Sequence, residues 1–170
     1  AEEAPILKPF IRLADVLGAF VGQVSDDPIK EIEILFDGAT ATMNTRALTS
    51  ALLAGLIRNQ VADVNMVSAP IMIKEKGIVL SEVKRDKTGV YDGYIKLTVK
   101  TDKQTRSVAG TVFSDGKPRF IQIKGINMDA DVGANMVYIS NTDVPGMIGF
   151  MGTTLGDAGV NIANFQLGRD

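Results

Sequence analysis

Apolar and polar positions follow first a helical and then an extended period along the first part of the chain. Between residues 8 and 24 apolar side chains recur about every third or fourth position, which predicts an amphipathic helix that ends at the turn-forming segment 25–28. From residue 29 to residue 36 apolar and polar residues alternate, which is typical of a strand with one buried face. Asp37-Gly38 follows as a turn signal. The pattern therefore predicts a helix followed directly by a strand.

The helical period returns after this strand. From Leu48 onward apolar residues recur on one face at spacings of three, four, seven and eight, which predicts a helix that continues to residue 60. Thr45 is its predicted N-cap, because threonine is a common capping residue. Another helix is predicted within 64–77, in which Pro70 must either lie in the first turn, where the lack of an N–H is tolerated, or break the helix. Met66 and Met72 are interpreted as core-filling side chains rather than as a metal or cofactor site.

The segment after Gly77 is extended throughout. Stretches of alternating polarity predict four strands, at 78–85, 94–102, 107–118 and 119–126. Asp115-Gly116 is a hairpin signal between the last two of these strands. Helices followed by a strand meander predict an α+β domain, with an antiparallel sheet and helices packed on one of its faces.

Beyond Ile126 the sequence changes to short apolar runs and a glycine-rich stretch. The predicted order is strand, turn, helix and strand, at 135–140, 141–146, 147–159 and 160–168. Gly159 is the predicted C-terminal cap of the helix, because this position favours left-handed backbone. We predict that this β-α-β unit is a second domain, which divides the chain into residues 1–131 and 132–170.

The composition excludes several kinds of chemistry. The 170 residues include no Cys and no His, which excludes thiolate nucleophiles, His-based triads and Cys- or His-ligated metal sites, so no metal site is predicted. No apolar run approaches the roughly 20 residues of a membrane-spanning helix, and the first residues lack the basic start of a signal peptide. The sequence predicts a soluble, cytoplasmic protein with no membrane partner.

Charge is distributed unevenly along the chain. Residues 70–125 hold 12 Lys and Arg against 6 Asp and Glu, whereas both flanks are acidic. Lys117 and Arg119 share one face of a strand by the two-residue period, and with a hairpin N–H they are candidates for binding a small anion. A solvated sheet face explains the same charges equally well. No nucleic-acid partner is expected, because the net charge is −2 and the strands lack interleaved aromatic residues.

The turn at 141–146 joins a predicted strand to a predicted helix. Pro145 suits the first turn, and Gly146 allows close approach to the backbone. Free N–H groups at the helix start favour a carboxylate, and Asp143 favours an ammonium group, so an amino-acid zwitterion is one candidate ligand. The alternative is that Asp143 only caps the helix. The glycines at 146, 149 and 152 lack the dinucleotide-binding spacing, so no NAD site is predicted in this chain.

A resemblance to a known family adds to these patterns. Residues 141–170, NTDVPGMIGFMGTTLGDAGVNIANFQLGRD, resemble the ACT domain of D-3-phosphoglycerate dehydrogenases, through D-x-P-G-x-I-G, L-G-D/E-x-G-V-N-I-A and G-R-D/E. Upstream, KPFIRLADVLGAFVGQ, MNTRALTSALLAGL, VNMVSAPI and VAGTVFSDGKPRFIQIKG resemble the intervening, allosteric substrate-binding domain of the long-chain form of that enzyme. The resemblance implies a partial ACT unit, the first half of a ferredoxin-like βαββαβ fold. The family's nucleotide-binding and catalytic parts would precede residue 1.

The resemblance also implies functional positions. In ACT domains of this kind serine binds in the loop between the first strand and the helix, usually across a subunit interface. The matching positions here are Asn141, Asp143, Pro145, Gly146, Met147, Ile148 and Asn161. In the intervening domain, Arg119 matches a position that can hold an anion such as 3-phosphoglycerate, whereas Asp131 stands where the family has a second basic residue.

The resemblance therefore implies a regulatory, non-catalytic fragment of an NAD-dependent oxidoreductase of serine biosynthesis. L-serine is its expected feedback effector, NAD is expected only in the catalytic part of the parent, and a homo-oligomer is the expected assembly. Two alternatives stay open at this point, a regulatory domain of an L-serine dehydratase and a stand-alone amino-acid-binding module.

Overall fold

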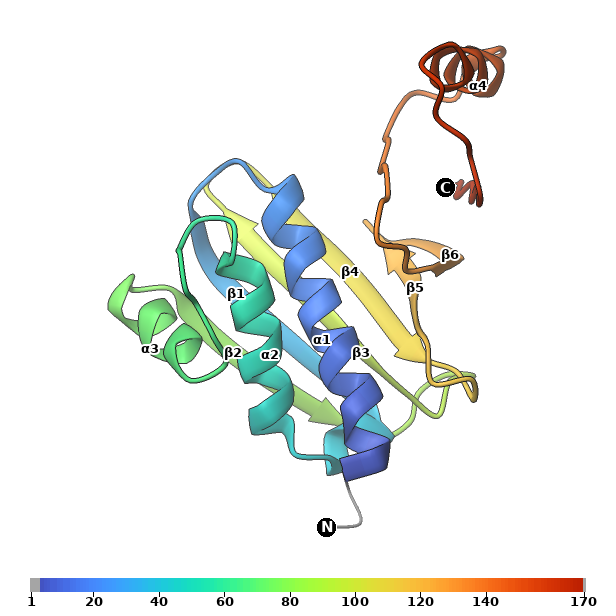
Figure 1. Ribbon diagram of the computed structural model, residues 1–170. Coiled ribbons are helices and arrows are strands. Elements are labelled where there is room, and N and C mark those ends of the chain that lie inside the picture. The colour runs from blue at the N-terminus through green and yellow to red at the C-terminus, as the bar shows by residue number, and fades with distance from the viewer. Residues whose placement is uncertain (1–3, 170) are drawn as a thin grey trace.

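The computed structural model describes residues 4–169, which form an α+β fold around one six-stranded sheet (Figure 1). The elements in chain order are α1 (Ala4–Val24), β1 (Ile29–Gly38), the 3-10 helix η1 (Ala39–Thr42), α2 (Thr45–Ile57), α3 (Ser68–Glu75), β2 (Val79–Arg85), β3 (Gly93–Thr101), β4 (Thr105–Val112), β5 (Pro118–Ile123), β6 (Ile126–Asp131) and α4 (Met147–Asp157). The predicted α+β class is confirmed. So are the predicted helices and strands up to residue 126, with boundaries that shift by a few residues.

The strands lie in the order β2-β1-β3-β4-β5-β6. From β1 through β3 to β6 every neighbouring pair is antiparallel, as predicted. In contrast, β2 runs parallel to β1, with Val79 opposite Glu31, so the sheet is mixed rather than purely antiparallel. The reason is the connection, because α2 and α3 carry the chain from the end of β1 back to its starting end before β2 begins, as parallel neighbours require.

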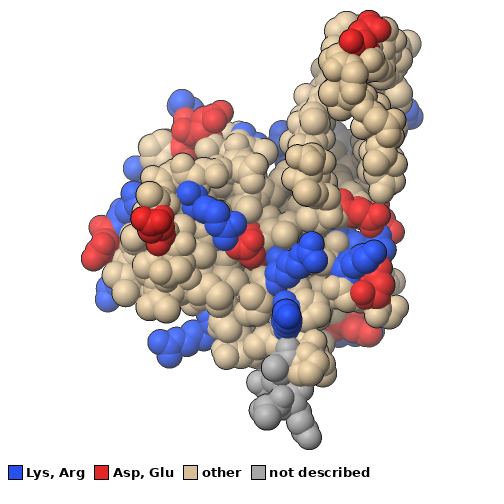
Figure 2. Space-filling view, in the orientation of Figure 1, with Lys and Arg blue, Asp and Glu red and all other residues tan. Residues whose placement is uncertain are grey.

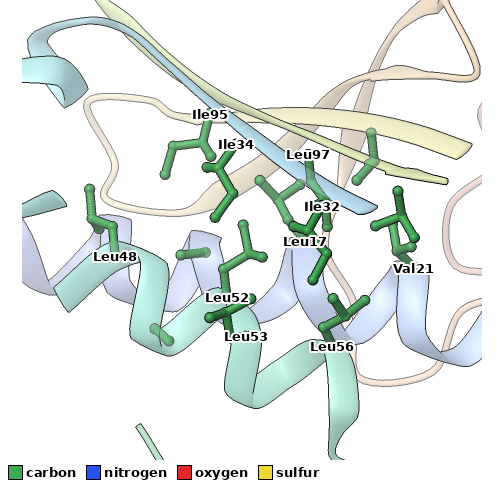
Figure 3. Packing of buried hydrophobic residues seen from close by; sticks show 14 of the residues in the cluster. Leu17, Val21, Ile32, Ile34, Leu48, Leu52, Leu53, Leu56, Ile95 and Leu97 are labelled. Carbon is green, nitrogen blue, oxygen red and sulfur yellow. The ribbon is translucent and has the colours of Figure 1, made fainter. Parts of the chain in front are cut away.

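Helices α1 and α2 cover one face of the sheet, and the hydrophobic core lies between them and the strands (Figure 3). Buried and more exposed positions alternate along β3, because one of its faces meets the helices and the other does not. Helix α1 also crosses β4, where a Cβ at Gly110 would contact the side chains of Leu13 and Leu17. The labelled core residues in Figure 3 are Leu17, Val21, Ile32, Ile34, Leu48, Leu52, Leu53, Leu56, Ile95 and Leu97.

The two covering helices contact each other through their backbones. A Cβ at Gly18 in α1 would overlap the carbonyl oxygen of Leu52, and a Cβ at Gly55 in α2 would overlap that of Asp15. Arg58 and Asp15 form an ion pair across the same contact. Glycine at positions 18 and 55 is therefore what allows α1 and α2 to pack this closely.

Two local predictions in this part of the chain need correction. The N-cap of α2 is Asn44, whose side chain accepts a hydrogen bond from the backbone N–H of Ala47 at 3.2 Å, whereas Thr45 is already the first helical residue. Both residue types cap helices well, and the sequence places them side by side. Met72 packs against the core as predicted, but Met66 precedes α3 and is 38% exposed.

The chain after β6 leaves the sheet. The predicted helix at 147–159 is confirmed as α4, and Gly159 follows it with a φ of 73°, as predicted for a C-terminal cap. The strands predicted at 135–140 and 160–168 are wrong for this structure, because both segments are irregular. A strand persists only when a neighbour pairs with it, and in a split β-α-β unit that neighbour is a third strand. No segment within residues 4–169 takes that place.

Residues 132–146 run from the sheet to α4, which Figure 1 shows apart from the other helices. Tyr138 holds this segment to the body of the fold, because its ring packs edge-on against Phe20 with 5.5 Å between the ring centroids. β6 ends at Asp131, where the sequence predicts a domain boundary, and the division into two domains stays a prediction.

Candidate functional site

The turn before α4 leaves the first N–H groups of this helix without a side-chain cap. Gly146 is the N-cap residue, with φ of 89° and ψ of −9°, a left-handed conformation that glycine adopts at little cost. The first N–H groups of a helix have no partner within it, and they lie at the positive end of the helix dipole. This end of α4 is therefore suited to bind a carboxylate.

Asp143 does not cap α4. Its Oδ2 lies 3.8 Å from Nε of Arg169, and both side chains are more than half exposed, at 76% and 67%. The interpretation of Asp143 as a helix cap is therefore wrong, since the cap of α4 carries no side-chain hydrogen bond. The carboxylate keeps most of its surface open to solvent and is accessible to a cationic group.

The other predicted effector residues are not gathered into a pocket. Asn141 donates a hydrogen bond from Nδ2 to the carbonyl of Thr142 at 2.8 Å, and Asn161 lies exposed after α4. No hydrogen bond within residues 4–169 joins Asn141, Asp143 and Asn161 to one another. Pro145, Gly146 and Ile148 are exposed and Met147 is half-buried. The structure thus holds the helix N-terminus and a nearby carboxylate, but not a closed site.

Arg119, the candidate anion ligand on β5, is surrounded by carboxylates. It forms an ion pair with Asp131 on the neighbouring strand, and its nitrogens lie 3.2 Å from Asp115 and 3.9 Å from Asp129. The guanidinium also lies over the ring of Phe113, 4.8 Å from its centroid. Three carboxylates around one guanidinium give a local excess of negative charge, which does not favour anion binding.

Lys117, the second candidate, lies in the hairpin turn before β5 and not on the strand. Its backbone N–H donates to Oδ1 of Asp115 at 2.9 Å. This hydrogen bond is the largest cause that lowers the pKa of Asp115, and the nearby charge of Arg119 lowers it further. Asp115 therefore stays ionised and remains paired with Arg119. A shared anion site at Lys117 and Arg119 stays a prediction, and this geometry does not favour it.

The structure also shows a polar cluster that the sequence interpretation missed. The side chain of Asp37 is completely buried, and it accepts hydrogen bonds from Arg85 Nε at 2.6 Å and from Thr88 Oγ1 at 2.7 Å. Arg85 also donates to the hydroxyl of Tyr94. Burial acts to raise the pKa of Asp37, but the hydrogen bonds from Thr88 and Arg85 outweigh it, so the pKa is lowered. The cluster attaches the loop after β2 to the end of β1.

Residues 4–169 contain no group of three His, Cys, Asp or Glu side chains placed to hold a metal ion. Within the same residues, no helix is long and apolar enough to span a bilayer.

Comparison with known proteins identifies the relatives of this chain. Residues 6–124 match the family model of the D-3-phosphoglycerate dehydrogenase intervening domain. A D-3-phosphoglycerate dehydrogenase of Bacillus subtilis is 34% identical over 169 residues, which cover 99% of this chain and 32% of the relative. One of Methanocaldococcus jannaschii is 35% identical over 166 residues, or 96% of this chain and 31% of the relative. The chain thus spans about a third of the length of the curated relatives it matches.

Proposed function

Because the chain belongs to the family of D-3-phosphoglycerate dehydrogenase intervening domains, we propose that it is a regulatory, non-catalytic part of an NAD-dependent dehydrogenase of serine biosynthesis. Oxidation of 3-phosphoglycerate and binding of NAD belong, in this proposal, to other parts of the parent enzyme. The family match favours this function over an L-serine dehydratase subunit and over a stand-alone amino-acid-binding module.

The proposed ligand of this regulatory part is L-serine, bound at the start of α4. The observation that carries the proposal is the uncapped N-terminus of α4, with the exposed carboxylate of Asp143 three residues before its glycine cap. A zwitterion needs an electropositive group for its carboxylate and an anionic group for its ammonium. The N–H groups after Gly146 and the carboxylate of Asp143 supply these two poles.

The remaining part of the site is proposed to come from a second subunit or from further residues of the parent. Figure 2 shows the segment that carries α4 as an arm with few charged side chains. Val144, Ile148 and Phe150 are 46%, 51% and 68% exposed around the ligand position. Exposed apolar side chains in such a group typically mark an interface, so a homo-oligomer that covers the bound serine is part of the proposal.

Calorimetric titration of L-serine into the full-length parent protein tests this function. Asp143→Ala should weaken binding by roughly ten- to a hundredfold, the usual effect of losing a charged hydrogen-bond partner. Asp157→Ala, the same change at the other end of α4, is the matched control and should bind normally. Ethanolamine and lactate each carry only one of the two poles and should bind more weakly than serine.

The proposal fails if Asp143→Ala and Asp157→Ala bind serine as tightly as the unmodified protein. Circular dichroism of both variants should show unchanged helix content, since both side chains are exposed and neither caps α4.

A further inference from the structure

The exposed apolar side chains of the sheet region gather along one edge. Eight large apolar residues within 4–131 are exposed, and six of them lie between residues 66 and 83. These six are Met66, Val67, Ile71, Val79, Leu80 and Val83. Figure 1 shows α3 beside β2 at this edge of the sheet. We call residues 66–85 the β2–α3 edge.

Strand β2 has only one partner within the described chain. It pairs with β1 on one side and ends the sheet on the other, and all seven of its residues are exposed. The N–H and C=O groups on an open edge are a template for another strand. Edges of monomeric proteins are commonly blocked by proline, by a bulge, by a covering loop or by charged side chains. β2 contains no proline, and its register with β1 is continuous over residues 79–85. Its charged residues, Glu82, Lys84 and Arg85, carry both signs, so they exclude only those partner strands that place like charges opposite each other.

We propose that the β2–α3 edge binds a second copy of this chain, through antiparallel pairing of β2 with β2 of the copy. A two-fold axis that relates two such strands runs perpendicular to the sheet, so it keeps each side chain on the same face. Residues that face each other must then both have odd or both have even numbers, because side chains alternate along a strand. One residue of β2 therefore lies on the axis and faces itself.

The charges of β2 select Val83 as that residue. With Val83 on the axis, Glu82 of each copy faces Lys84 of the other, and two apolar side chains meet at the centre. With Glu82 on the axis two carboxylates meet, and with Lys84 on the axis two ammonium groups meet, and like charges directly opposite are destabilising. With Ser81 on the axis, Glu82 faces Leu80 and Lys84 has no acidic residue opposite. The sequence of β2 is thus complementary to itself in one register.

The side chains at these positions are available for such pairing. Glu82 accepts a hydrogen bond from Thr49 Oγ1 through one carboxylate oxygen, which leaves the second oxygen for a partner. Lys84 lies on the same face of β2 by alternation, and it forms no salt bridge with the residues that the structure describes. Pairing of two short strands buries little area, so α3 and its exposed apolar residues must add to the contact. We therefore expect a weak, concentration-dependent dimer.

Cysteine cross-linking tests the register directly, because the natural sequence contains no Cys. Directly opposite residues of antiparallel strands have Cα atoms about 4.5–5.5 Å apart, which a disulfide can bridge. Under mild oxidation Val83→Cys should form a covalent dimer at least about tenfold faster than Val90→Cys. Val90 is the matched control, since it is 87% exposed and lies outside the β2–α3 edge. Random collisions would favour the more exposed position.

Charge reversal supplies a second, independent measurement. Sedimentation of the cysteine-free chain should show that Lys84→Glu weakens the dimer roughly tenfold, because each Glu82 then faces a carboxylate. The double variant Glu82→Lys/Lys84→Glu restores both opposite pairs and should recover the dimer. Circular dichroism checks that both variants are folded.

The proposal is overturned if the unmodified chain stays monomeric at high concentration. It is also overturned if a dimer forms but Val83→Cys cross-links no faster than Val90→Cys. An oligomer built only through residues 132–169 would give that second result.

Discussion

Replacing Gly18 by Ala tests whether the backbone contact between α1 and α2 fixes the position of both helices. In a free helix this change is favourable by roughly 1 kcal/mol. Here the new Cβ would overlap the carbonyl oxygen of Leu52, and it would lie 2.9 Å from the backbone nitrogen of Leu56. Both obstacles are backbone atoms, so no side-chain rotation relieves the clash, and the two helices must move apart.

The change in the free energy of unfolding is the difference between a packing cost and a gain in helix propensity. Inserting a carbon into a closely packed core typically costs about 1–3 kcal/mol, and a backbone obstacle places this site in the upper part of that range. Subtracting the gain in helix propensity leaves a net loss of about 1–2 kcal/mol in the free energy of unfolding. For a chain of this size such a loss lowers Tm by about 2–8 °C.

Urea unfolding followed by far-UV circular dichroism measures this loss. Gly89→Ala is the control, because a Cβ at Gly89 would meet nothing within 4 Å. It should leave stability unchanged or raise it by less than about 1 kcal/mol. If Gly18→Ala unfolds at the same or a higher urea concentration than the unmodified chain, the reasoning is refuted, because the helices can then separate without cost.

Two further predictions concern acid stability and catalysis. Asp37 has a lowered pKa in the folded chain, so its contribution to stability is present above the unfolded value of 3.8 and is lost as the pH falls below it. Asp37→Asn should therefore lose less stability than the unmodified chain between about pH 6 and pH 3, in urea midpoints measured at each pH, and equal losses would contradict the assigned role. The purified chain should form no NADH from NAD⁺ and 3-phosphoglycerate, since it lacks His, Cys and a dinucleotide fingerprint. Any turnover above a buffer control would contradict the proposed non-catalytic role.

The helices and strands of the sheet region can be predicted from the sequence. Each of them buries one face, and this gives its apolar residues the period of a helix or of a strand. The alternation from Ile29 to Phe36 predicts β1, since the side chains of one face meet the helices. The direction of β2 does not follow from alternation, because half-buried parallel and antiparallel strands show the same pattern. The two helices between β1 and β2 were the signal for a parallel pair.

After β6 the local pattern of apolar residues predicts the helix correctly but not the strands. The glycine-rich helix forms at 147–157 because its hydrogen bonds are internal. The apolar runs on either side have the composition of strands, but pairing depends on a partner that no local pattern supplies.

In the candidate site, too, features set by neighbouring residues could be predicted and contacts between distant residues could not. The helix start at Gly146 was accessible from the turn sequence, whereas the ion pair of Asp143 with Arg169 joins residues far apart in the chain. Asp37 likewise lies 48 residues from Arg85 and 51 from Thr88, so the cluster around its buried carboxylate left no spacing signal to detect.

The position of α1 over β4 has a consequence for how the protein is made. Leu13 and Leu17 are covered by a strand that contains Gly110, which the ribosome adds almost a hundred residues later. At about 5–20 residues per second, the side of α1 that faces β4 waits about 5–20 s for its cover, whereas α2 can pack against α1 sooner. During that interval the helix is a target for chaperones and for aggregation. The slow step of folding is therefore expected to be the arrival of the central antiparallel strands, and not the formation of the helix that precedes them.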